Sequence, residues 1–258
     1  MIVEYHRPAI LEEALRLLGR SQPITAPLGG GTALLHSIKD PIAVVDLQAL
    51  GLDTLQIQGN SLQLGATLSL QSLLEQLDAQ PMASELRRTI LHEATYNLRQ
   101  VATVAGTLVA ATGRSPFTTA LLALDAEITL QPGEETLSLG DLLPLRVERL
   151  RGRLITQITL PLNVRLAYEY VARTPADQPI VCAAAARWPS GRTRVALGGY
   201  GESPTLSFDG GEPDGAAIAA RDAYAEAGDA WASAEYRSEI AAILVERCLE
   251  KINQAQER

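Results

Sequence analysis

Apolar positions recur in this chain with helical spacing in some stretches and with alternation in others. The first predicted helix opens after Pro8 and ends at Gly19. The residues on its apolar face are Leu11, Ala14, Leu15 and Leu18. Short apolar strands are expected at residues 2–5, 24–28 and 42–46. These elements make a unit of about fifty residues, which is too small to bury a core alone, so we expect it to pack on the region that follows.

Alternating residues predict two hairpins in that region. Residues 55–64 and residues 127–139 each alternate around a turn that contains glycine. Between the hairpins, helical spacing predicts helices from Leu70, after Pro81 and from Pro116. A strand that Pro161 ends is expected to close the region.

Two further expectations concern single segments. In the helix after Pro81, Leu86 and Ile90 fall on the apolar face, so Arg87 and Arg88 are assigned to the solvated face. Residues 101–104, with the sequence Val-Ala-Thr-Val, are interpreted as a strand that leads into a turn of small residues. Both expectations rest on short apolar runs.

The character of the sequence changes after Asn163, where we place a domain boundary. Residues 1–163 would form the first region, with subdomains at about residues 1–52 and 53–163, and residues 164–258 would form the second. The second begins with three predicted antiparallel strands, at residues 166–171, 181–188 and 194–197. Two helices, at residues 216–227 and 233–248, are expected to close the chain. The expected fold class is therefore α+β.

Three consecutive glycines, Gly29 to Gly31, directly follow the strand expected at residues 24–28. Glycine tolerates positive φ and lets backbone N–H groups approach a ligand without a Cβ in the way, so this turn could hold a diphosphate. The alternative is a tight turn without a ligand, which the triplet alone favours because the spacing of a dinucleotide fingerprint is missing. Ala105 and Gly106 permit a second close approach, and packing against a neighbour is its simpler interpretation.

Composition and charge narrow the possible partners. The chain of 258 residues has a net charge of −8, a pI near 5.0 and only 4% aromatic residues. Nucleic-acid binding is disfavoured, because the sequence offers neither a basic face that would release counterions nor an aromatic platform for bases. No apolar run is long enough to span a membrane, and the first residues do not have the pattern of a secretory leader. We expect a cytoplasmic protein.

Neither a metal site nor a catalytic residue is predicted. Cys182 and Cys248 lie in separate apolar segments, which is typical of buried thiols in a reducing compartment. The three histidines are scattered without the spacing of zinc ligands. Motifs of common hydrolases, phosphate-binding loops and zinc proteases are missing from the sequence. The carboxylates considered as acid–base groups, Asp46, Asp125 and Asp141, stand at the ends of predicted elements, where capping is the commoner role.

Several short motifs occur in an order that resembles one protein family over nearly the whole chain. After the helix near Pro8, they are Gly29-Gly30-Gly31-Thr32, Gly65-Ala66-Thr67, Thr103-Val104-Ala105-Gly106, Leu122-Ala123-Leu124-Asp125-Ala126 and Ser233-Ala234-Glu235-Tyr236-Arg237. The chain resembles the FAD-binding medium subunit of the molybdenum hydroxylases, the group that includes xanthine dehydrogenase and aerobic carbon monoxide dehydrogenase.

The resemblance implies a fold, a cofactor and partners. The fold would be a two-part FAD-binding region of the vanillyl-oxidase (PCMH) type, followed by a small C-terminal domain of the carbon monoxide dehydrogenase flavoprotein kind. The cofactor would be FAD. Electrons would come from iron–sulfur centres of a 2Fe-2S small subunit, which together with a molybdopterin large subunit completes a hetero-oligomer, and would pass to an external acceptor. The chain itself would contribute no catalytic residue.

The resemblance also implies which residues contact FAD. The first glycine loop would wrap the diphosphate, the second would contact the cofactor from the neighbouring subdomain, and two more residues would lie near the flavin. These residues are Leu28, Gly29, Gly30, Gly31, Thr32, Ala33 and Leu34 in the first loop, Thr103, Ala105, Gly106 and Thr107 in the second, then Leu154 near the isoalloxazine and Tyr168 at the edge of the flavin site.

Two alternatives to this function remain. A flavin-free structural or assembly subunit would keep the fold and lose the pocket, and Ala33 and Pro116 favour it because they stand where relatives often carry acidic residues. A flavin oxidoreductase that works without an iron–sulfur partner would need a catalytic acid or base, and the sequence offers no convincing one.

Overall fold

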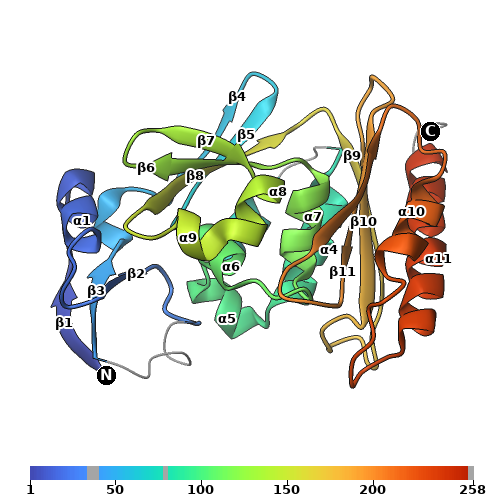
Figure 1. Cartoon of the computed structure of the whole chain (residues 1–258). Coiled ribbons are helices and arrows are strands. Elements are labelled where there is room, and N and C mark those ends of the chain that lie inside the picture. Colours follow the sequence, from blue (N-terminus) through green and yellow to red (C-terminus); the bar gives the residue numbers. More distant parts are fainter. Residues whose placement is uncertain (34–40, 78–80, 255–258) are drawn as a thin grey trace. The chain divides into compact units, whose positions relative to one another are not determined.

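The structure is a computed structural model that describes residues 1–33, 41–77 and 81–254 (Figure 1). Contacts divide the chain into two compact units, each built from several stretches. Unit 1 consists of Met1–Gln76, Thr95–Ala110 and Glu127–Thr159, and unit 2 of Leu77–Ala94, Ala111–Ala126 and Leu160–Arg258. The sequence-based boundary near residue 163 stays a prediction.

Unit 1 begins with a small parallel sheet in the order β1-β3-β2. Its strands are β1 (Ile2–His6), β2 (Thr25–Leu28) and β3 (Ile42–Asp46). The central strand β3 is almost continuously apolar and buried, as expected for a parallel strand that is covered on both faces. Helix α1 (Leu11–Leu18) packs Ala14 and Leu18 in a cluster with Val45 and Leu154. The helix and strands predicted for this segment are confirmed.

The second sheet of unit 1 has five strands in the order β4-β5-β8-β6-β7. Both predicted hairpins are confirmed, since β4 pairs with β5 and β6 with β7, each in antiparallel fashion. The strands are β4 (Leu55–Gln58), β5 (Ser61–Gly65), β6 (Glu127–Gln131), β7 (Glu135–Ser138) and β8 (Leu154–Pro161). The helices of this region are α3 (Leu70–Gln76), α5 (Tyr96–Val101), α6 (Val104–Ala110), α8 (Leu139–Leu142) and α9 (Arg146–Arg149).

The strand predicted at residues 101–104 is wrong, because this stretch links helix α5 to helix α6. Its only strand-like feature among the described residues is one isolated β-bridge between Ser69 and Thr103. Thr103 Oγ1 accepts a hydrogen bond from the N–H group of Gly106 at 3.1 Å, which is how threonine caps the first turn of a helix. A four-residue apolar run cannot be told from part of a helix by periodicity alone.

Unit 2 contains an antiparallel sheet in the order β12-β11-β10-β9. Its strands are β9 (Arg165–Val171), β10 (Val181–Arg187), β11 (Thr193–Gly198) and β12 (Thr205–Gly210). The sheet thus has four strands rather than the three predicted. In β12, Leu206 and Phe208 alternate with polar residues, a signal that is weak because this edge strand is short and partly exposed.

Helices cover both faces of the sheet in unit 2. Helices α10 (Ala216–Ala223) and α11 (Ala234–Gln254) share a core with Ala183 and Ala185 of β10. Helices α4 (Ala83–Glu93) and α7 (Pro116–Ala123) contact strands of the same sheet, and Cys182 Sγ lies 3.8 Å from the hydroxyl of Thr119 on α7. Because successive strand residues point to opposite faces, these helices lie on the two sides of β10.

The face of α4 beside β9 carries charged residues. Leu86 and Ile90 are fully buried, as predicted, but Arg88 does not simply face solvent. Its Nη1 donates to the backbone oxygen of Tyr168 at 2.6 Å, and Glu85 Oε2 accepts from the Tyr168 N–H group at 3.2 Å. Because β9 is an edge strand, these two side chains satisfy backbone groups that would otherwise lack a strand partner.

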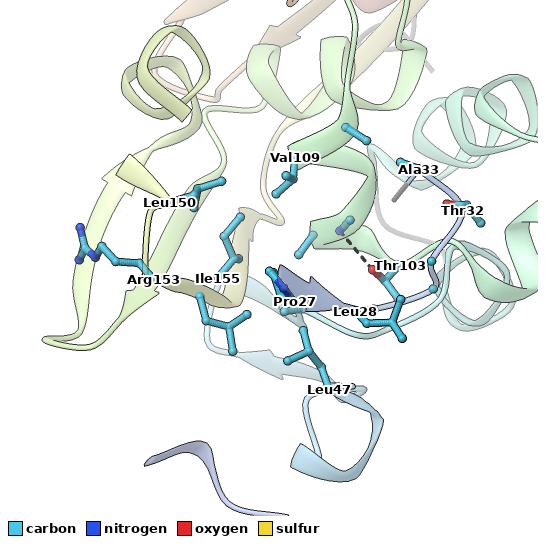
Figure 2. A pocket seen from close by; sticks show the side chains of 18 residues that line it. Pro27, Leu28, Thr32, Ala33, Leu47, Thr103, Val109, Leu150, Arg153 and Ile155 are labelled. Carbon is cyan, nitrogen blue, oxygen red and sulfur yellow. Dashed lines mark hydrogen bonds between the residues drawn. The ribbon is translucent and has the colours of Figure 1, made fainter. Parts of the chain in front are cut away.

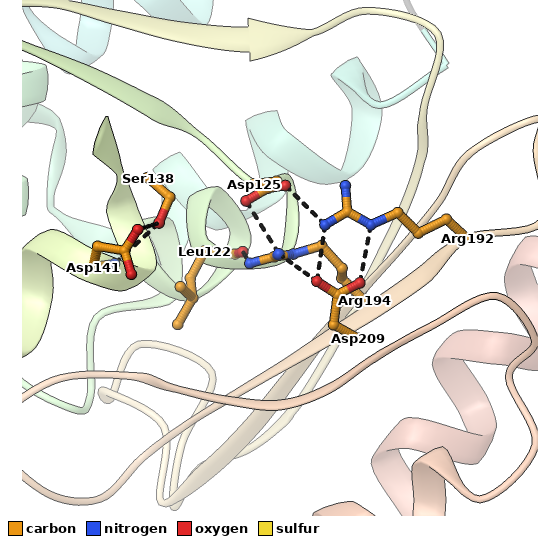
Figure 3. A network of polar contacts seen from close by, with 7 residues as sticks. All are labelled: Leu122, Asp125, Ser138, Asp141, Arg192, Arg194 and Asp209. Atoms are coloured by element: carbon orange, nitrogen blue, oxygen red, sulfur yellow. Dashed lines mark hydrogen bonds and ion pairs between the residues drawn. The ribbon is translucent and has the colours of Figure 1, made fainter. Parts of the chain in front are cut away.

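Four charged residues join the end of α7 to the neighbouring strands β11 and β12 (Figure 3). The side chain of Arg194 on β11 is only 6% exposed, and its Nη1 lies 3.1 Å from Asp125 and 2.7 Å from Asp209. Its Nη2 donates to the backbone oxygen of Leu122 in the last turn of α7 at 3.3 Å. Arg192 binds the same two carboxylates but is 40% exposed. Two arginines thus balance two carboxylates, and the buried one also binds a helix carbonyl.

Glu93, the last residue of α4, closes the first turn of α7. Its Oε2 accepts hydrogen bonds from the Ser115 hydroxyl at 2.8 Å and from the Phe117 N–H group at 2.9 Å. Between them Pro116 occupies the start of α7, where its fixed φ suits a helix and its missing N–H group is not needed. Burial of the carboxylate raises the pKa of Glu93 to about 6, and the two hydrogen bonds oppose this only in part.

We expect Glu93→Gln to stabilise the protein at pH 7 and to leave its stability nearly unchanged at pH 4. A carboxyl group whose pKa is higher in the folded than in the unfolded chain takes up a proton on folding, so stability is lost as the pH rises between the two values. Raising the pKa from 4.5 to about 6 corresponds to about 2 kcal/mol, and glutamine keeps an acceptor for Ser115. Urea unfolding of both proteins across this pH range measures the effect, and a constant difference between them would refute it.

Both cysteines are free and buried, as predicted, and burial raises the pKa of Cys182 to about 12. Among the residues that the structure describes, no group of three or more His, Cys, Asp or Glu is arranged to hold a metal ion. None of the described helices is both long and apolar enough to cross a membrane.

Candidate functional site

A cavity of about 520 Å³ opens in unit 1 between the loop after β2, helix α6 and the start of β8 (Figure 2). It brings together most of the residues that the sequence singles out. Those that line it are Leu28, Gly29, Gly30, Gly31, Thr32, Ala33, Thr103, Ala105, Gly106 and Leu154. Two loops about seventy residues apart in sequence therefore share one cavity with the first residue of β8.

Two of the other residues singled out by the sequence, Thr107 and Tyr168, are not among the described residues that line this cavity. Leu34 lies outside the described residues. Thr107 turns its hydroxyl back along α6 and donates to the Thr103 backbone oxygen at 2.9 Å. Tyr168 belongs to unit 2, where it is fully buried and its hydroxyl lies 3.0 Å from His92 Nδ1.

The glycines are required where the two loops meet. A Cβ on Gly30 would lie 1.7 Å from the Val101 backbone oxygen, which no side-chain movement can relieve. A Cβ on Gly29 or on Gly106 would lie 2.8 or 2.7 Å from the hydroxyl oxygen of Thr103. Thr103 therefore stands between a glycine of each loop. Close packing, the simpler interpretation from sequence for Ala105 and Gly106, agrees with the approach of Gly106 to Thr103. The glycines of both loops form part of the cavity wall.

The first loop leaves backbone donors for a ligand. Within the described part of the chain, the N–H groups of Gly29, Gly30, Gly31 and Thr32 donate to no protein acceptor. Gly31 has φ of +71°, a conformation that L side chains rarely adopt. Successive N–H groups in such a turn form a concave binding site for anions. A diphosphate therefore fits the chemistry of this loop.

The remaining wall of the cavity is mainly apolar and was largely missed by sequence reasoning. Val109 of α6, Leu150 after α9 and Ile155 of β8 line it together with Leu154. Apolar side chains with few polar groups are typical of sites for flat organic cofactors. Val109 and Leu150 could not be identified from the sequence as cavity residues, because each has the spacing of an ordinary packing residue.

The cavity has one charged side chain among its described lining residues, that of Arg153. Its guanidinium Nη1 lies 2.6 Å from Glu135 Oε2 on β7. This hydrogen bond, more than any other contact, lowers the pKa of Glu135 below its usual value. No carboxylate, histidine or cysteine lines the described wall. Backbone donors beside an apolar wall are the arrangement typical of a site that binds an organic cofactor.

Comparison with known protein families supports a cofactor-binding role for this site. Residues 1–163 match the family described as the FAD binding domain in molybdopterin dehydrogenase. The chain belongs to this family. It is therefore an oxidoreductase subunit of the molybdenum hydroxylase group, and its cofactor is FAD.

Individual proteins and solved structures are similar to this chain over more than the residues 1–163 that match the family. The uncharacterized protein YgfM of Escherichia coli (strain K12) is 32% identical over 202 residues, which are 77% of this chain and 75% of that protein. The carbon monoxide dehydrogenase medium chain of Afipia carboxidovorans is 24% identical over an alignment of 277 positions that covers 96% of each chain. A structure of reconstituted CO dehydrogenase from Oligotropha carboxidovorans matches with a TM-score of 0.81 at 23% identity over 96% of both chains. The predicted α+β fold is confirmed.

Proposed function

We propose that this chain is the FAD-binding electron-transfer subunit of a cytoplasmic molybdopterin-dependent dehydrogenase or hydroxylase. Bound FAD supplies the redox chemistry, accepting electrons and passing them to an external acceptor. The observation that carries the proposal is the cavity in which two glycine-containing loops meet around Thr103. In this role the protein binds and orients its cofactor and shields it from water.

Different parts of the cavity would hold different parts of FAD. The N–H groups of Gly29 to Thr32 would donate to the diphosphate, because they are clustered and unengaged by the described protein. Leu28, Val109 and Leu154 would pack on the ring systems, since they form apolar wall. Contacts of Leu34, Thr107 and Tyr168 with FAD stay predictions from the resemblance.

The proposal includes partner chains. A 2Fe-2S small subunit would deliver electrons to the flavin, and a molybdopterin large subunit would bind the substrate to be hydroxylated. Two observations support this assignment of electron transfer and substrate binding to different subunits. The described cavity wall offers no acid–base residue for a substrate, and the Afipia relative is named as the medium chain of its enzyme.

The alternative, a flavin-free subunit, was suggested by the lack of acidic side chains at Ala33 and Pro116, and the geometry of these two residues gives it no further support. Ala33 lines the cavity without filling it. Pro116 has a local explanation, since it begins α7 beside the capping residue Ser115. Neither residue closes a pocket in the described part of the chain.

Reconstitution with FAD tests the proposed function. The purified chain is incubated with excess FAD, desalted and examined by absorption spectroscopy. We expect a flavin band that stays with the protein, with about one FAD per chain. A colourless protein with no measurable affinity for FAD would favour the structural subunit instead.

A further inference from the structure

Arg153 lines the cavity just before β8 begins, and its guanidinium is turned away from the glycine loop (Figure 2). The side chain is 22% exposed, so it lies at the wall without being enclosed by it. Its donors reach Glu135 of β7 and, more weakly, the backbone oxygen of Pro132 at 3.5 Å. Of the described residues that line the cavity, it alone brings a positive charge.

Glu135 is shared by two arginines. Arg153 Nη1 lies 2.6 Å from one carboxylate oxygen, and Arg149 Nη1 lies 3.1 Å from the other. Two positive charges thus face one negative charge, which leaves one positive charge in excess beside the cavity. Solvent reaches this group, since the side chains of Glu135 and Arg149 are 40% and 44% exposed.

This sharing makes Arg153 easy to release. If its guanidinium leaves Glu135, Arg149 still neutralises the carboxylate, so no unpaired charge results. Solvent-exposed ion pairs contribute little to stability, so breaking one of the two pairs is a small loss. An arginine held by a single buried carboxylate would not be free to move in this way.

We propose that Arg153 is a cofactor-binding residue whose guanidinium turns from Glu135 to an anionic oxygen of bound FAD, while Arg149 stays on Glu135. The inference rests on the proposed function, because it needs FAD in this cavity. FAD offers two anionic groups, the diphosphate and the reduced isoalloxazine ring. Guanidinium suits both, because its planar donors bind phosphate oxygens well and its charge stabilises a nearby anion.

Two matched substitutions test the inference. Arg153→Gln and Arg149→Gln each remove one of the two arginines from Glu135, but only the first changes the cavity wall. Affinities for oxidised FAD and for riboflavin, which lacks phosphate, are measured by flavin fluorescence, and the midpoint potential of bound FAD by redox titration. Urea unfolding checks that both variants are folded, and Arg153→Lys, which keeps the charge, is included as a rescue.

Contact with the diphosphate predicts that Arg153→Gln weakens FAD binding about tenfold and leaves riboflavin binding unchanged. Contact with the reduced ring predicts equal binding of oxidised FAD but about tenfold weaker binding of reduced FAD, which lowers the two-electron midpoint potential by about 30 mV. Either result supports the inference if Arg149→Gln resembles the wild type and Arg153→Lys recovers part of the loss.

Two kinds of result overturn the inference, and they can be told apart. If the wild type binds FAD and Arg153→Gln matches it in every measurement, or if both glutamine variants lose binding equally, Arg153 has no special contact with the cofactor. If the wild type binds no FAD at all, the proposed function fails and this inference fails with it.

Discussion

Gly30→Ala should weaken FAD binding by about a hundredfold. The new Cβ would lie 1.7 Å from the Val101 backbone oxygen, so the loop after β2 must move away from the end of α5. Overpacking of this kind typically costs about 1–3 kcal/mol, and more where the obstacle is backbone. If about 3 kcal/mol is lost from the bound arrangement of the loops, FAD affinity falls by about a hundredfold.

Gly211→Ala is the matched control, because a Cβ on Gly211 would meet nothing within 4 Å and its φ is not in the left-handed region. FAD titrations of the two variants by flavin fluorescence, together with urea unfolding, separate a local effect from a general one. We expect Gly211→Ala to bind FAD as the wild type does. Equal affinity in Gly30→Ala would mean that the two loops need not touch for the cofactor to bind.

Arg194→Leu should destabilise unit 2 by about 1.5–3 kcal/mol, the usual contribution of hydrogen bonds to charged groups, because Arg194 itself is buried while both carboxylates are partly exposed and keep Arg192. The substitution leaves Asp125 and Asp209 without their buried partner and the Leu122 backbone oxygen without a donor. Asp125 also holds φ of 55°, in the left-handed region that aspartate tolerates better than most residues.

Arg192→Gln is the control for this prediction. Arg192 binds the same two carboxylates, but its side chain is 40% exposed and the described network keeps Arg194 in its absence. An exposed pair contributes at most about 1 kcal/mol. Urea unfolding followed by circular dichroism compares the two variants, and a loss in Arg192→Gln as large as in Arg194→Leu would show that burial does not set the strength of this network.

Much of the site could be predicted from the sequence because its chemistry lies in local backbone features. The sequence shows two places where small residues let the backbone closely approach a ligand or a neighbouring segment. They are the glycine triplet at Gly29 to Gly31 and the pair Ala105 and Gly106. The contact between these two loops could not be predicted from the sequence. It depends on Thr103, which links α5 to α6 and contacts a glycine of each loop, whereas the sequence pattern predicted a strand there.

Arg153 and Arg88 show why charged residues were harder to place. Helical spacing assigned Arg88 to the solvated face, yet it binds the backbone of Tyr168 eighty residues away. No sequence pattern identified Arg153 as a residue of the cavity, because charged residues are common at the start of a strand. Periodicity reports which side of one element is apolar, but it does not report which other element provides an unpaired carbonyl or a carboxylate.

The sequence by itself determined the hairpins, the helices with a clear apolar face, the α+β class and the two small-residue loops, because these follow from local periodicity and from the conformations that glycine permits. Only the tertiary structure decided that the loops touch, that Glu135 is shared by two arginines and that one of them lines the cavity. These features depend on contacts between residues far apart in the chain, whose partners no local pattern can specify.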